Sequence, residues 1–447
     1  MGSVARTAVI GGGMAGCAAA RELVRSGREV VIFEVGEGLG GRARSWHRPE
    51  IEPTVGINLM YVSFYPLMSK LVEEFGLKDE LVKISSSVYI SDGGDAVPLS
   101  SDSPINVLKY PLASLRDRFA FALAGIREVL RRDQMDLFDP LKAAPFDDGT
   151  SIAEFAHRYM SPRGFDFLLR PQVEGFWNFR CEDVSNVHGR ALLAWLGGSD
   201  FYVFRGGMQV LAERLAEGAD ARFGHEVSDL QLTGSGVQVS ARTPVGEPVS
   251  EVFDDVVVAT PAPIAAKLTA TLPADVVGSE TRAFLETQEY EPAISFAYLV
   301  DHGSLPAEAH IVAGGSADPP IRNMITYPRK VRDEQGRPVD KLLVFAYPGR
   351  ALTRRLLGAS PEEQFATVTP LLNTLWRDFP ADPEPFQIAE RPFGFPIPAP
   401  GRYRQSAEVI GRLRPPVAFA GDYFNSPTTE AALLSGTRAA HALTAAG

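Results

Sequence analysis

The chain has 447 residues, enough for two domains, and its 45% hydrophobic and 22% charged residues are typical of a folded globular protein rather than a disordered one. The formal net charge of −11 at pH 7 argues against a nucleic acid partner, whose phosphates require neutralisation by Lys and Arg. Two cysteines cannot form a disulfide framework, and neither a signal peptide nor a membrane span is apparent, so we expect a cytoplasmic protein.

A strand, a helix and a second strand open the chain. Residues 7–10 form a short apolar run, typical of a strand that is buried on both faces. The Ala-rich segment 17–26 predicts a helix that ends at Gly27, and 29–33 predicts a second buried strand followed by Glu34. Together these segments form one strand–helix–strand unit of about 30 residues.

A glycine-rich turn joins the first strand to the helix. Its GxGxxG spacing permits a tight turn, the close approach of a pyrophosphate and close helix–strand packing, at Gly11, Gly13 and Gly16. The helix N-terminus, which includes Met14 and Ala15, offers N–H groups and a positive dipole end to phosphates. A carboxylate at the position of Glu34 accepts hydrogen bonds from an adenosine ribose. The unit therefore predicts a dinucleotide site, without distinguishing FAD from NAD.

A second glycine-rich segment follows at residues 38–45. Gly40 and Gly41 let the backbone approach a ligand, and Arg42 places a fixed positive charge beside a pyrophosphate. An NAD site does not need this loop, whereas the pyrophosphate and ribityl chain of an extended FAD run past it. The segment favours FAD, and a surface turn with solvated arginines is the alternative.

Later strand patterns indicate a domain assembled from separated pieces. Apolar runs return at 236–240, 256–259 and 417–420, and an Ala-rich helix is expected over 429–441. We therefore expect an α/β fold in which a Rossmann-type FAD-binding domain is interrupted twice by a second, α+β substrate-binding domain. The FAD-binding domain is expected to take residues 1–80, 196–280 and 395–447, and the substrate-binding domain 81–195 and 281–394.

A helical pattern over residues 115–132 has two different faces. Apolar residues share one face, namely Phe119, Leu123, Ile126 and Leu130. The charged residues are expected to face solvent rather than a membrane surface, and they are Arg116, Asp117, Arg127, Glu128 and Arg131.

Five segments together resemble the flavin amine oxidase superfamily, which also contains protoporphyrinogen oxidase and the carotenoid desaturases. They follow the order of the family along the chain, at 9–45, 206–211, 225–227, 256–263 and 420–440. They contain the runs VIGGG and GGRARS, the loop GGM, the segment HEV, the strand VVVATPAP and the motif AGD followed by TTEAALLSGTRAA.

This resemblance implies roles for individual residues. The Val227 backbone would meet the adenine, Asp422 would accept hydrogen bonds from the ribityl chain, and the helix near Thr429 would direct its positive end at the flavin. Covalent members of the family attach the flavin through a cysteine near the C-terminal motif, which this chain lacks, so non-covalent FAD is expected. The other cofactor-binding positions that we expect are Gly56, Ile57, Asn58, Thr260 and Gly421.

Three departures from the amine oxidase pattern bear on the reaction. Many members carry a Lys that holds a water at the flavin N5, whereas the matching position here is about Ser295, and 290–300 contains no Lys. The aromatic residue that often walls the substrate amine is Thr428 here. The double-glycine turn after the arginine motif is reduced to Gly56, and Asn58 follows it.

These absences favour a dehydrogenating oxidase or desaturase, because hydride transfer to flavin depends on proximity and orientation more than on a fixed acid or base. We therefore expect FAD-dependent oxidation of a small, largely apolar or cyclic molecule, with dioxygen or another acceptor taking the electrons. An amine or amide oxidase that forms an imine is one alternative, and an FAD-binding isomerase or catalytically weak relative is another. The sequence identifies no catalytic residue, substrate or oligomeric state.

Several other residues have a simpler interpretation. Trp177 could line a substrate pocket, although such an aromatic residue is more typical of a core. Arg322 and Arg329 could bind a substrate carboxylate, although solvated surface arginines are more common. The seven histidines and two cysteines lack metal-ligand spacing, so we expect no metal site.

Overall fold

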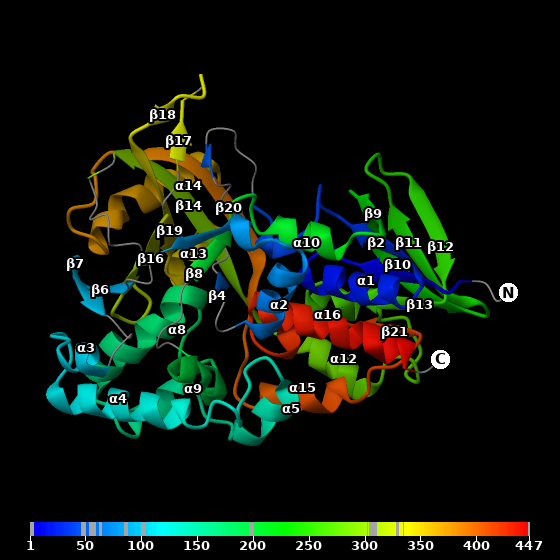
Figure 1. Cartoon of the computed structure of the whole chain (residues 1–447), viewed down its shortest axis with the longest axis horizontal. Helices are drawn as coiled ribbons and strands as arrows, with labels where there is room; N and C mark the ends of the chain where they lie inside the picture. Colours follow the sequence, from blue (N-terminus) through cyan, green and yellow to red (C-terminus); the bar gives the residue numbers. More distant parts are fainter. Residues whose placement is uncertain are drawn as a thin grey trace.

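The computed structural model describes most of the chain. It covers residues 4–45, 51–52, 60–61, 65–84, 88–99, 104–195, 201–301, 303, 311–327, 330–333 and 335–445. Two large sheets dominate the fold, with helices packed around them (Figure 1).

The first large sheet has five parallel strands in the order β21-β13-β1-β2-β9. Its strands are β1 (Arg6–Ile10), β2 (Glu29–Glu34), β9 (Asp220–Phe223), β13 (Asp255–Val258) and β21 (Val417–Phe419). Helices α1 (Met14–Arg25) and α16 (Thr429–Thr444) lie side by side against it (Figure 1). This sheet confirms the expected Rossmann-type core, and each of its inner strands contains a run of buried apolar residues, as burial on both faces requires.

A three-stranded antiparallel sheet flanks this core. It consists of β10 (Glu226–Thr233), β11 (Gly236–Arg242) and β12 (Pro248–Phe253). The alternating segment that begins at Gly236 therefore forms a strand, but it belongs to this small sheet and not to the parallel one.

The second large sheet has seven strands, in the order β20-β14-β19-β16-β15-β6-β7. They are β6 (Val88–Asp92), β7 (Asp95–Leu99), β14 (Tyr290–Asp301), β15 (Ile311–Gly314), β16 (Ile321–Tyr327), β19 (Lys341–Pro348) and β20 (Glu384–Pro396). The long antiparallel pair β14–β20 runs from this sheet toward the parallel sheet (Figure 1). Its length is what carries residues of the seven-stranded sheet to the edge of the Rossmann core.

Short elements and helices complete the structure. The remaining strands are β3 (Ile51–Glu52), β4 (Met60–Tyr61), β5 (Leu81–Ile84), β8 (Phe201–Phe204), β17 (Lys330–Arg332) and β18 (Pro338–Val339). The other helices are α2 (Pro66–Glu74), α3 (Pro104–Leu108), α4 (Leu115–Val129), α5 (Pro140–Ala143), α6 (Ile152–His157), α7 (Pro162–Gly164), α8 (Arg170–Trp177), α9 (Asn186–Trp195), α10 (Gln209–Leu215), α11 (Ala262–Leu268), α12 (Ser279–Glu286), α13 (Arg350–Leu356), α14 (Pro361–Val368) and α15 (Arg402–Ile410). Within the described residues, none of these helices has the length and apolar character of a bilayer-spanning segment.

The orientation of α4 differs from the sequence expectation. Two of the charged residues expected at the surface, Asp117 and Glu128, are buried, whereas the apolar face of the helix is exposed. Asp117 accepts hydrogen bonds from the Ser161 backbone N–H and hydroxyl, at 2.8 and 2.7 Å, and Glu128 pairs with Arg190 at 3.1 Å. These partners hold both carboxylates inside the protein, and a periodicity argument could not have found them because they lie on other segments.

A buried carboxyl group ties α16 to α2. Glu430, in the first turn of α16, accepts hydrogen bonds from the backbone N–H groups of Leu67 and Met68, at 2.6 and 2.8 Å. Burial raises the pKa of the Glu430 carboxyl to about 7, although the two N–H groups oppose this shift. Helix α16 also borders the large cavity described below. The contact of Glu430 with α2 therefore helps to hold α16 in its position at that cavity.

We predict that Glu430 makes the protein less stable as the pH rises. In the unfolded chain this carboxyl ionises near its ordinary pKa, whereas in the folded protein it resists ionisation up to about pH 7. The free energy of unfolding should therefore fall by up to about 3 kcal/mol between about pH 4.5 and 7 from this group. Thermal unfolding across that range should show wild type losing stability relative to Glu430→Gln. Glu362→Gln, on the exposed first turn of α14, controls for the loss of a carboxylate. If stability changed with pH in the same way in wild type and Glu430→Gln, the raised pKa of Glu430 would be refuted.

Candidate active site

A cavity of about 460 Å³ lies at the carboxyl ends of the parallel strands. The residues that follow β1, β2, β13 and β21 all line it, which is the edge where open α/β sheets bind their ligands. Its lining residues are Ile10, Gly11, Gly13, Met14, Ala15, Phe33, Glu34, Val35, Gly40, Gly41, Arg42, Ala43, His225, Glu226, Val227, Ala259, Thr260, Pro261, Ile264, Leu268, Phe393, Gly394, Phe395, Gly421, Asp422, Tyr423, Pro427, Thr428, Thr429 and Ala432.

The three glycines of the first turn have different surroundings. Gly11 has φ +106°, and a Cβ there would lie 2.9 Å from the Ala259 carbonyl oxygen. A Cβ at Gly16 would overlap the carbonyl oxygen of Gly11, so this glycine permits the helix to pack on its own turn. A Cβ at Gly13 would meet nothing within 4 Å, because Gly13 faces the cavity. The backbone of the turn is therefore open to a ligand, as a phosphate cradle requires.

Glu34 lies at the cavity wall at the end of β2. Its carboxylate accepts hydrogen bonds from the backbone N–H groups of Gly12 and Gly36, at 2.6 and 2.7 Å. Each carboxylate oxygen has a further lone pair, so Glu34 can still accept a hydrogen bond from a hydroxyl group in the cavity. Val227 lines the same cavity at the start of β10.

An ion pair joins the second glycine loop to the end of β21. The Arg42 guanidinium lies 2.7 Å from Asp422 and donates a second hydrogen bond to the Gly394 carbonyl oxygen at 3.0 Å. The Asp422 side chain is 7% exposed, so its charge is compensated by Arg42 at close range. These contacts bring the loop after β2, strand β20 and the turn after β21 to one wall of the cavity.

The N-terminus of α16 also reaches the cavity. Thr428 caps the helix by accepting a hydrogen bond from the Ala431 N–H at 3.2 Å, and Thr429 and Ala432 line the wall. Because α1 begins at Met14 on the same cavity, two positive helix ends meet there. A cavity with two helix N-termini, an open glycine turn and a ribose-type carboxylate fits a dinucleotide such as FAD.

Most of the predicted cofactor-binding residues come together in the structure. Of those within the described residues, all line this cavity except Gly16, which packs beneath the turn. Gly56, Ile57 and Asn58 lie outside the described residues. Sequence reasoning missed the contribution of β20, which supplies Phe393, Gly394 and Phe395. No local pattern marks these three, since they reach the cavity through the pairing of β20 with β14.

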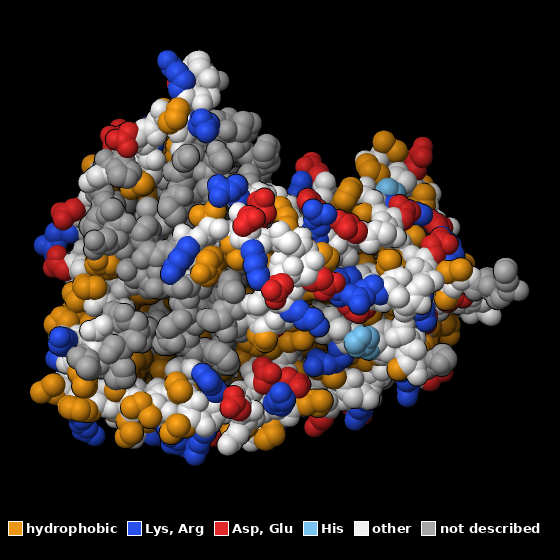
Figure 2. Space-filling view, viewed as in Figure 1, with side chains coloured by type: hydrophobic (Ala, Val, Ile, Leu, Met, Phe, Trp, Pro, Cys, Tyr) orange, Lys and Arg blue, Asp and Glu red, His pale blue; other side chains and the backbone are white. Residues whose placement is uncertain are grey.

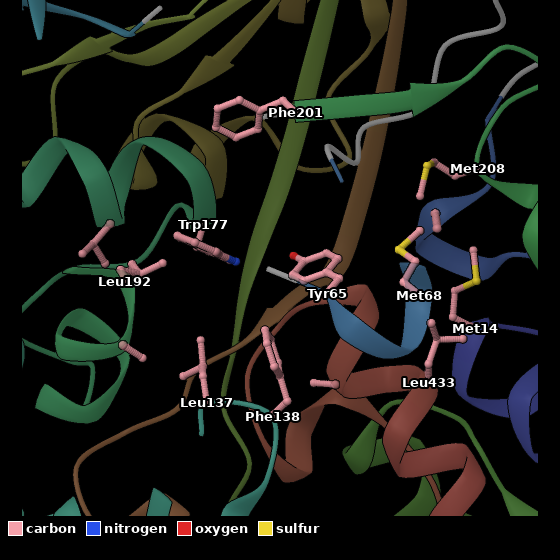
Figure 3. Packing of buried hydrophobic residues seen from close by; sticks show 14 of the residues in the cluster. Met14, Tyr65, Met68, Leu137, Phe138, Trp177, Leu192, Phe201, Met208 and Leu433 are labelled. Atoms are coloured by element: carbon pink, nitrogen blue, oxygen red, sulfur yellow. The ribbon is translucent and has the colours of Figure 1, made fainter. Parts of the chain in front are cut away.

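A smaller cavity of about 90 Å³ adjoins the first. The two share Phe395, Pro427, Thr428 and Thr429, and the other lining residues are Tyr65, Gly175, Phe176, Trp177, Asn178, Ala293, Ile294, Arg322, Asn323, Ile325 and Tyr347. Trp177 and Tyr65 extend toward one another from α8 and from the start of α2 (Figure 3). Trp177 donates a hydrogen bond to the Pro427 carbonyl oxygen at 3.1 Å, so it is both a core residue and part of the wall.

Two of the residues that line the small cavity carry side-chain amides. Asn178 donates to the Pro292 carbonyl oxygen at 3.1 Å, and Asn323 donates to the Gly175 carbonyl oxygen. These bonds fix the orientation of both amides and leave their Oδ1 atoms buried without a hydrogen-bond partner among the described residues. Both residues belong to the wall of the small cavity, so two buried acceptors without a partner lie beside it.

The charged groups beside the small cavity neutralise one another. Arg322 is 2% exposed and pairs with Glu174 at 2.9 Å, and it also donates to the Phe179 carbonyl oxygen. The expectation of a solvated Arg322 is therefore wrong, because a buried carboxylate on α8 holds it inside. Arg329 lies outside the described residues.

Strand β14 presents Ala293 to the small cavity, and not Ser295. Ser295 is buried on the same strand, and its hydroxyl has no hydrogen-bond partner among the described residues. Ser295, the position that matches the N5 lysine of the amine oxidase pattern, is therefore not among the described residues that line the small cavity.

Neither cysteine lines the large cavity. Cys17 is buried in α1, where burial raises the pKa of its thiol to about 12, and Cys181 is buried after α8. Neither is among the described residues that line either cavity. No cysteine among the described residues lines the large cavity, so none is in place there to form a thioether with a flavin.

Comparisons with known proteins agree with this geometry. The family model described as flavin containing amine oxidoreductase matches residues 14–444. A zeta-carotene desaturase of Synechocystis is 26% identical over 56% of this chain and 51% of its own length, and an (S)-6-hydroxynicotine oxidase of Paenarthrobacter nicotinovorans is 23% identical over 52% and 56%. The chain thus spans about half the length of these curated relatives.

Solved structures of the same fold cover nearly the whole chain. A variant of putrescine oxidase superposes with a TM-score of 0.73 at 17% identity, covering 99% of both chains. A putative protoporphyrinogen oxidase from Exiguobacterium superposes with a TM-score of 0.70 at 18% identity, covering 98% of both. The family match confirms the resemblance seen in the sequence motifs. The chain belongs to the flavin containing amine oxidoreductase family, whose members are FAD-dependent oxidoreductases.

Proposed function

We propose that this chain uses non-covalently bound FAD to dehydrogenate a small, largely apolar or cyclic molecule. Dioxygen or another acceptor then takes the electrons. We assign FAD binding to residues 1–80, 196–280 and 395–447, and substrate binding to 81–195 and 281–394.

The small cavity is the observation that carries this proposal. It shares a wall with the cofactor cavity, and its other walls are mainly aromatic and aliphatic side chains. None of the described residues that line it is a carboxylate, and its one cationic side chain, Arg322, is paired with Glu174. Apolar walls without a free charge favour an uncharged substrate.

The geometry of the large cavity supports the cofactor roles that we propose for its residues. The N–H groups of the Gly11–Ala15 turn and Arg42 are suited to the pyrophosphate, and Glu34 is suited to the adenosine ribose. Val227 lies where its backbone can meet the adenine, while Asp422 is suited to the ribityl hydroxyls. The start of α16 at Thr429 would place a positive helix end near the flavin ring.

The residues beside the substrate position are suited to orientation and exclusion of water. Bound FAD supplies the chemistry by accepting a hydride from the substrate. Ala293 and Thr428 carry no charge, so they cannot hold a proton as a lysine or carboxylate would. Trp177 and Phe395 shape the cavity instead, and positioning of the reacting C–H bond is the contribution that such walls can make.

A second candidate, oxidation of a neutral amine to an imine, is favoured by one observation. The unpaired Oδ1 atoms of Asn178 and Asn323 can each accept a hydrogen bond from an N–H group. An amine donor would satisfy buried acceptors that an aliphatic hydrocarbon would leave unpaired.

Anaerobic reduction of the bound flavin tests both candidates. The purified protein is mixed with cyclic amines, with cyclic hydrocarbons that have an oxidisable ring bond, and with diamines, and the loss of oxidised-flavin absorbance is followed. Reduction by uncharged cyclic compounds and not by diamines is expected. Reduction by diamines alone would overturn the proposal, and reduction by no compound in any class would favour the isomerase or weakly catalytic alternative.

We predict that Asn323→Ala lowers kcat/KM about two- to tenfold for a neutral amine substrate, if such an amine reduces the flavin. The variant removes a buried acceptor, and a hydrogen bond between neutral groups contributes about 0.5–1.5 kcal/mol. A hydrocarbon substrate should lose much less, because it makes no such bond. Equal losses for amine and hydrocarbon would indicate that Asn323 acts through packing on Gly175 and not through substrate recognition.

The two glycines of the first turn should respond differently to substitution. Gly13→Val places a side chain in the cavity, so the protein should fold normally and lose its flavin. Gly16→Ala makes a Cβ overlap the Gly11 carbonyl, so this variant should lose several kcal/mol of stability. The flavin-to-protein ratio and the thermal midpoint separate the two effects. A Gly13→Val protein with full flavin content would show that the pyrophosphate lies elsewhere.

We expect Asp422→Ala and Arg42→Ala to weaken FAD retention by roughly ten- to hundredfold each, because each removes a charged hydrogen-bond partner. Ser295→Ala is the matched control. It is buried on β14 but does not line the small cavity, so FAD content and flavin reduction rates should stay within a few fold of wild type. A loss of about a hundredfold in Ser295→Ala would mean that its hydroxyl holds a catalytic water after all.

A further inference from the structure

One wall of the small cavity brings together two neighbouring residues of strand β16. Asn323 and Ile325 line the cavity from one face of the strand, and Arg322 lines it as well. Neighbouring residues of a regular strand point to opposite faces, but the pairing of β16 with β19 shifts register between Ile321 and Asn323. Two residues of β16 advance there against one of β19, which is the pattern of a β-bulge. The bulge explains how Arg322 and Asn323 both reach the same cavity.

Arg322 provides this wall with a hydrogen-bond donor, its Nε–H group. Three acceptors hold the other nitrogens of the guanidinium: Glu174 at 2.9 Å, the Phe179 carbonyl oxygen at 3.1 Å and Asp318 at 3.3 Å. The Nε atom is buried and has no hydrogen-bond partner among the described residues. Lys and Arg side chains are spread over the surface that Figure 2 shows, whereas Arg322 is 2% exposed. A buried cationic N–H without an acceptor is costly, so the cavity is suited to a ligand that supplies one.

Asn323 provides the same wall with an acceptor, its Oδ1 atom. The amide is oriented by its Nδ2 group, which donates to the Gly175 carbonyl oxygen on α8. Exchanging the oxygen and nitrogen of this amide would bring two oxygens into contact, so the hydrogen bond determines the orientation. The Oδ1 atom is then left buried, without a partner among the described residues. A ligand that complements this wall presents a C=O and an N–H group on the same edge.

We propose that the small cavity binds a cyclic secondary amide, a small lactam, as the substrate class of this protein. The ring of a lactam forces a cis amide, so its C=O and N–H groups lie side by side on one edge. A linear secondary amide is trans and presents them on opposite edges. The lactam oxygen accepts a hydrogen bond from the Arg322 Nε–H, and the lactam N–H donates to the Asn323 Oδ1. The inference rests on the proposed function, because it takes the small cavity as the substrate position.

This orientation directs the ring carbons of the lactam toward the wall that the two cavities share. Phe395, Pro427 and Thr428 form part of that wall. Dehydrogenation removes a hydride and a proton from two adjacent ring carbons, and a C=C bond forms between them. The hydride, with its two electrons, goes to bound FAD, and the proton goes to water. A lactam is uncharged, which agrees with the pairing of Arg322 with Glu174.

Calorimetric titration of the flavin-loaded protein tests the proposal through binding. The flavin is reduced with dithionite beforehand, so that hydride transfer cannot take place. The probes are δ-valerolactam, N-methyl-δ-valerolactam, pyrrole and N-methylacetamide. The N-methylated lactam should bind about two- to tenfold more weakly than δ-valerolactam, because it loses a neutral hydrogen bond. Pyrrole leaves the cationic N–H unpaired and N-methylacetamide is trans, so each should bind at least about tenfold more weakly.

Two asparagine variants locate the bound lactam. Asn323→Ala removes the acceptor, so δ-valerolactam should lose its advantage over the N-methylated lactam. Asn178→Gly is the matched control, because it removes the other amide of the wall while glycine retains the φ of +58° at that position. This variant should keep the preference for the N–H compound. Flavin content and thermal midpoint are measured for both, and if Asn323→Ala does not fold, the ranking of the four probes by wild type still decides.

Equal binding of the four probes would mean that ordered water satisfies this wall, and it would overturn the proposal. Loss of the N–H preference in Asn178→Gly but not in Asn323→Ala would overturn it as well. Flavin reduction by other cyclic compounds, without lactam binding, would refute the lactam and leave the proposed function standing. The expected ranking of the probes without reduction of oxidised flavin by any lactam would support the binding site and refute dehydrogenation.

Discussion

The close packing of α1 against α16 sets the geometry of the site. A Cβ at Gly436 of α16 would overlap the carbonyl oxygen of Ala15 in α1. Because Gly436 lacks a side chain, the two helices approach closely enough for both N-termini to reach one cavity. A helix N-terminus carries unpaired N–H groups and about half a positive charge. The convergence of two such N-termini therefore favours an anionic ligand, independently of the charged side chains.

The second large sheet depends on this packing through one strand. Strand β20 places the Gly394 carbonyl against Arg42, which also binds Asp422 at the end of β21. Phe395, next in the chain, then lines both cavities. A single arginine thus connects the second glycine loop, the carboxylate after β21 and strand β20, whose next residue lines both cavities.

The cofactor cavity was largely predictable, because its residues sit in local motifs. Gly11, Glu34 and Arg42 follow strands in contiguous segments, and Asp422 follows another, so chain order alone places them at one sheet edge. The smaller cavity was not predictable in the same way. Asn323 and Phe395 come from distant strands, and their meeting depends on sheet pairing that no local pattern encodes.

The orientation of α4 and the burial of Arg322 share one physical cause. Periodicity assigns charged residues to solvent, but a carboxylate or guanidinium turns inward when a partner on another segment satisfies it. Ser161 and Arg190 do so for α4, and Glu174 does so for Arg322. A sequence pattern can thus identify a helix such as α4. Which face of that helix is buried depends on residues far away in the chain.

Charge neutralisation around the small cavity bears directly on which substrates it can admit. Glu174 is shared between Arg322 and Arg170, so neither its negative charge nor their positive charges are left to compensate a buried ion. A cationic substrate would have to give up its hydration with only amide oxygens in return, which costs several kcal/mol. A neutral molecule avoids that cost. The same walls accept a hydrocarbon or an uncharged amine, and the Oδ1 atoms of Asn178 and Asn323 are the groups that distinguish between them.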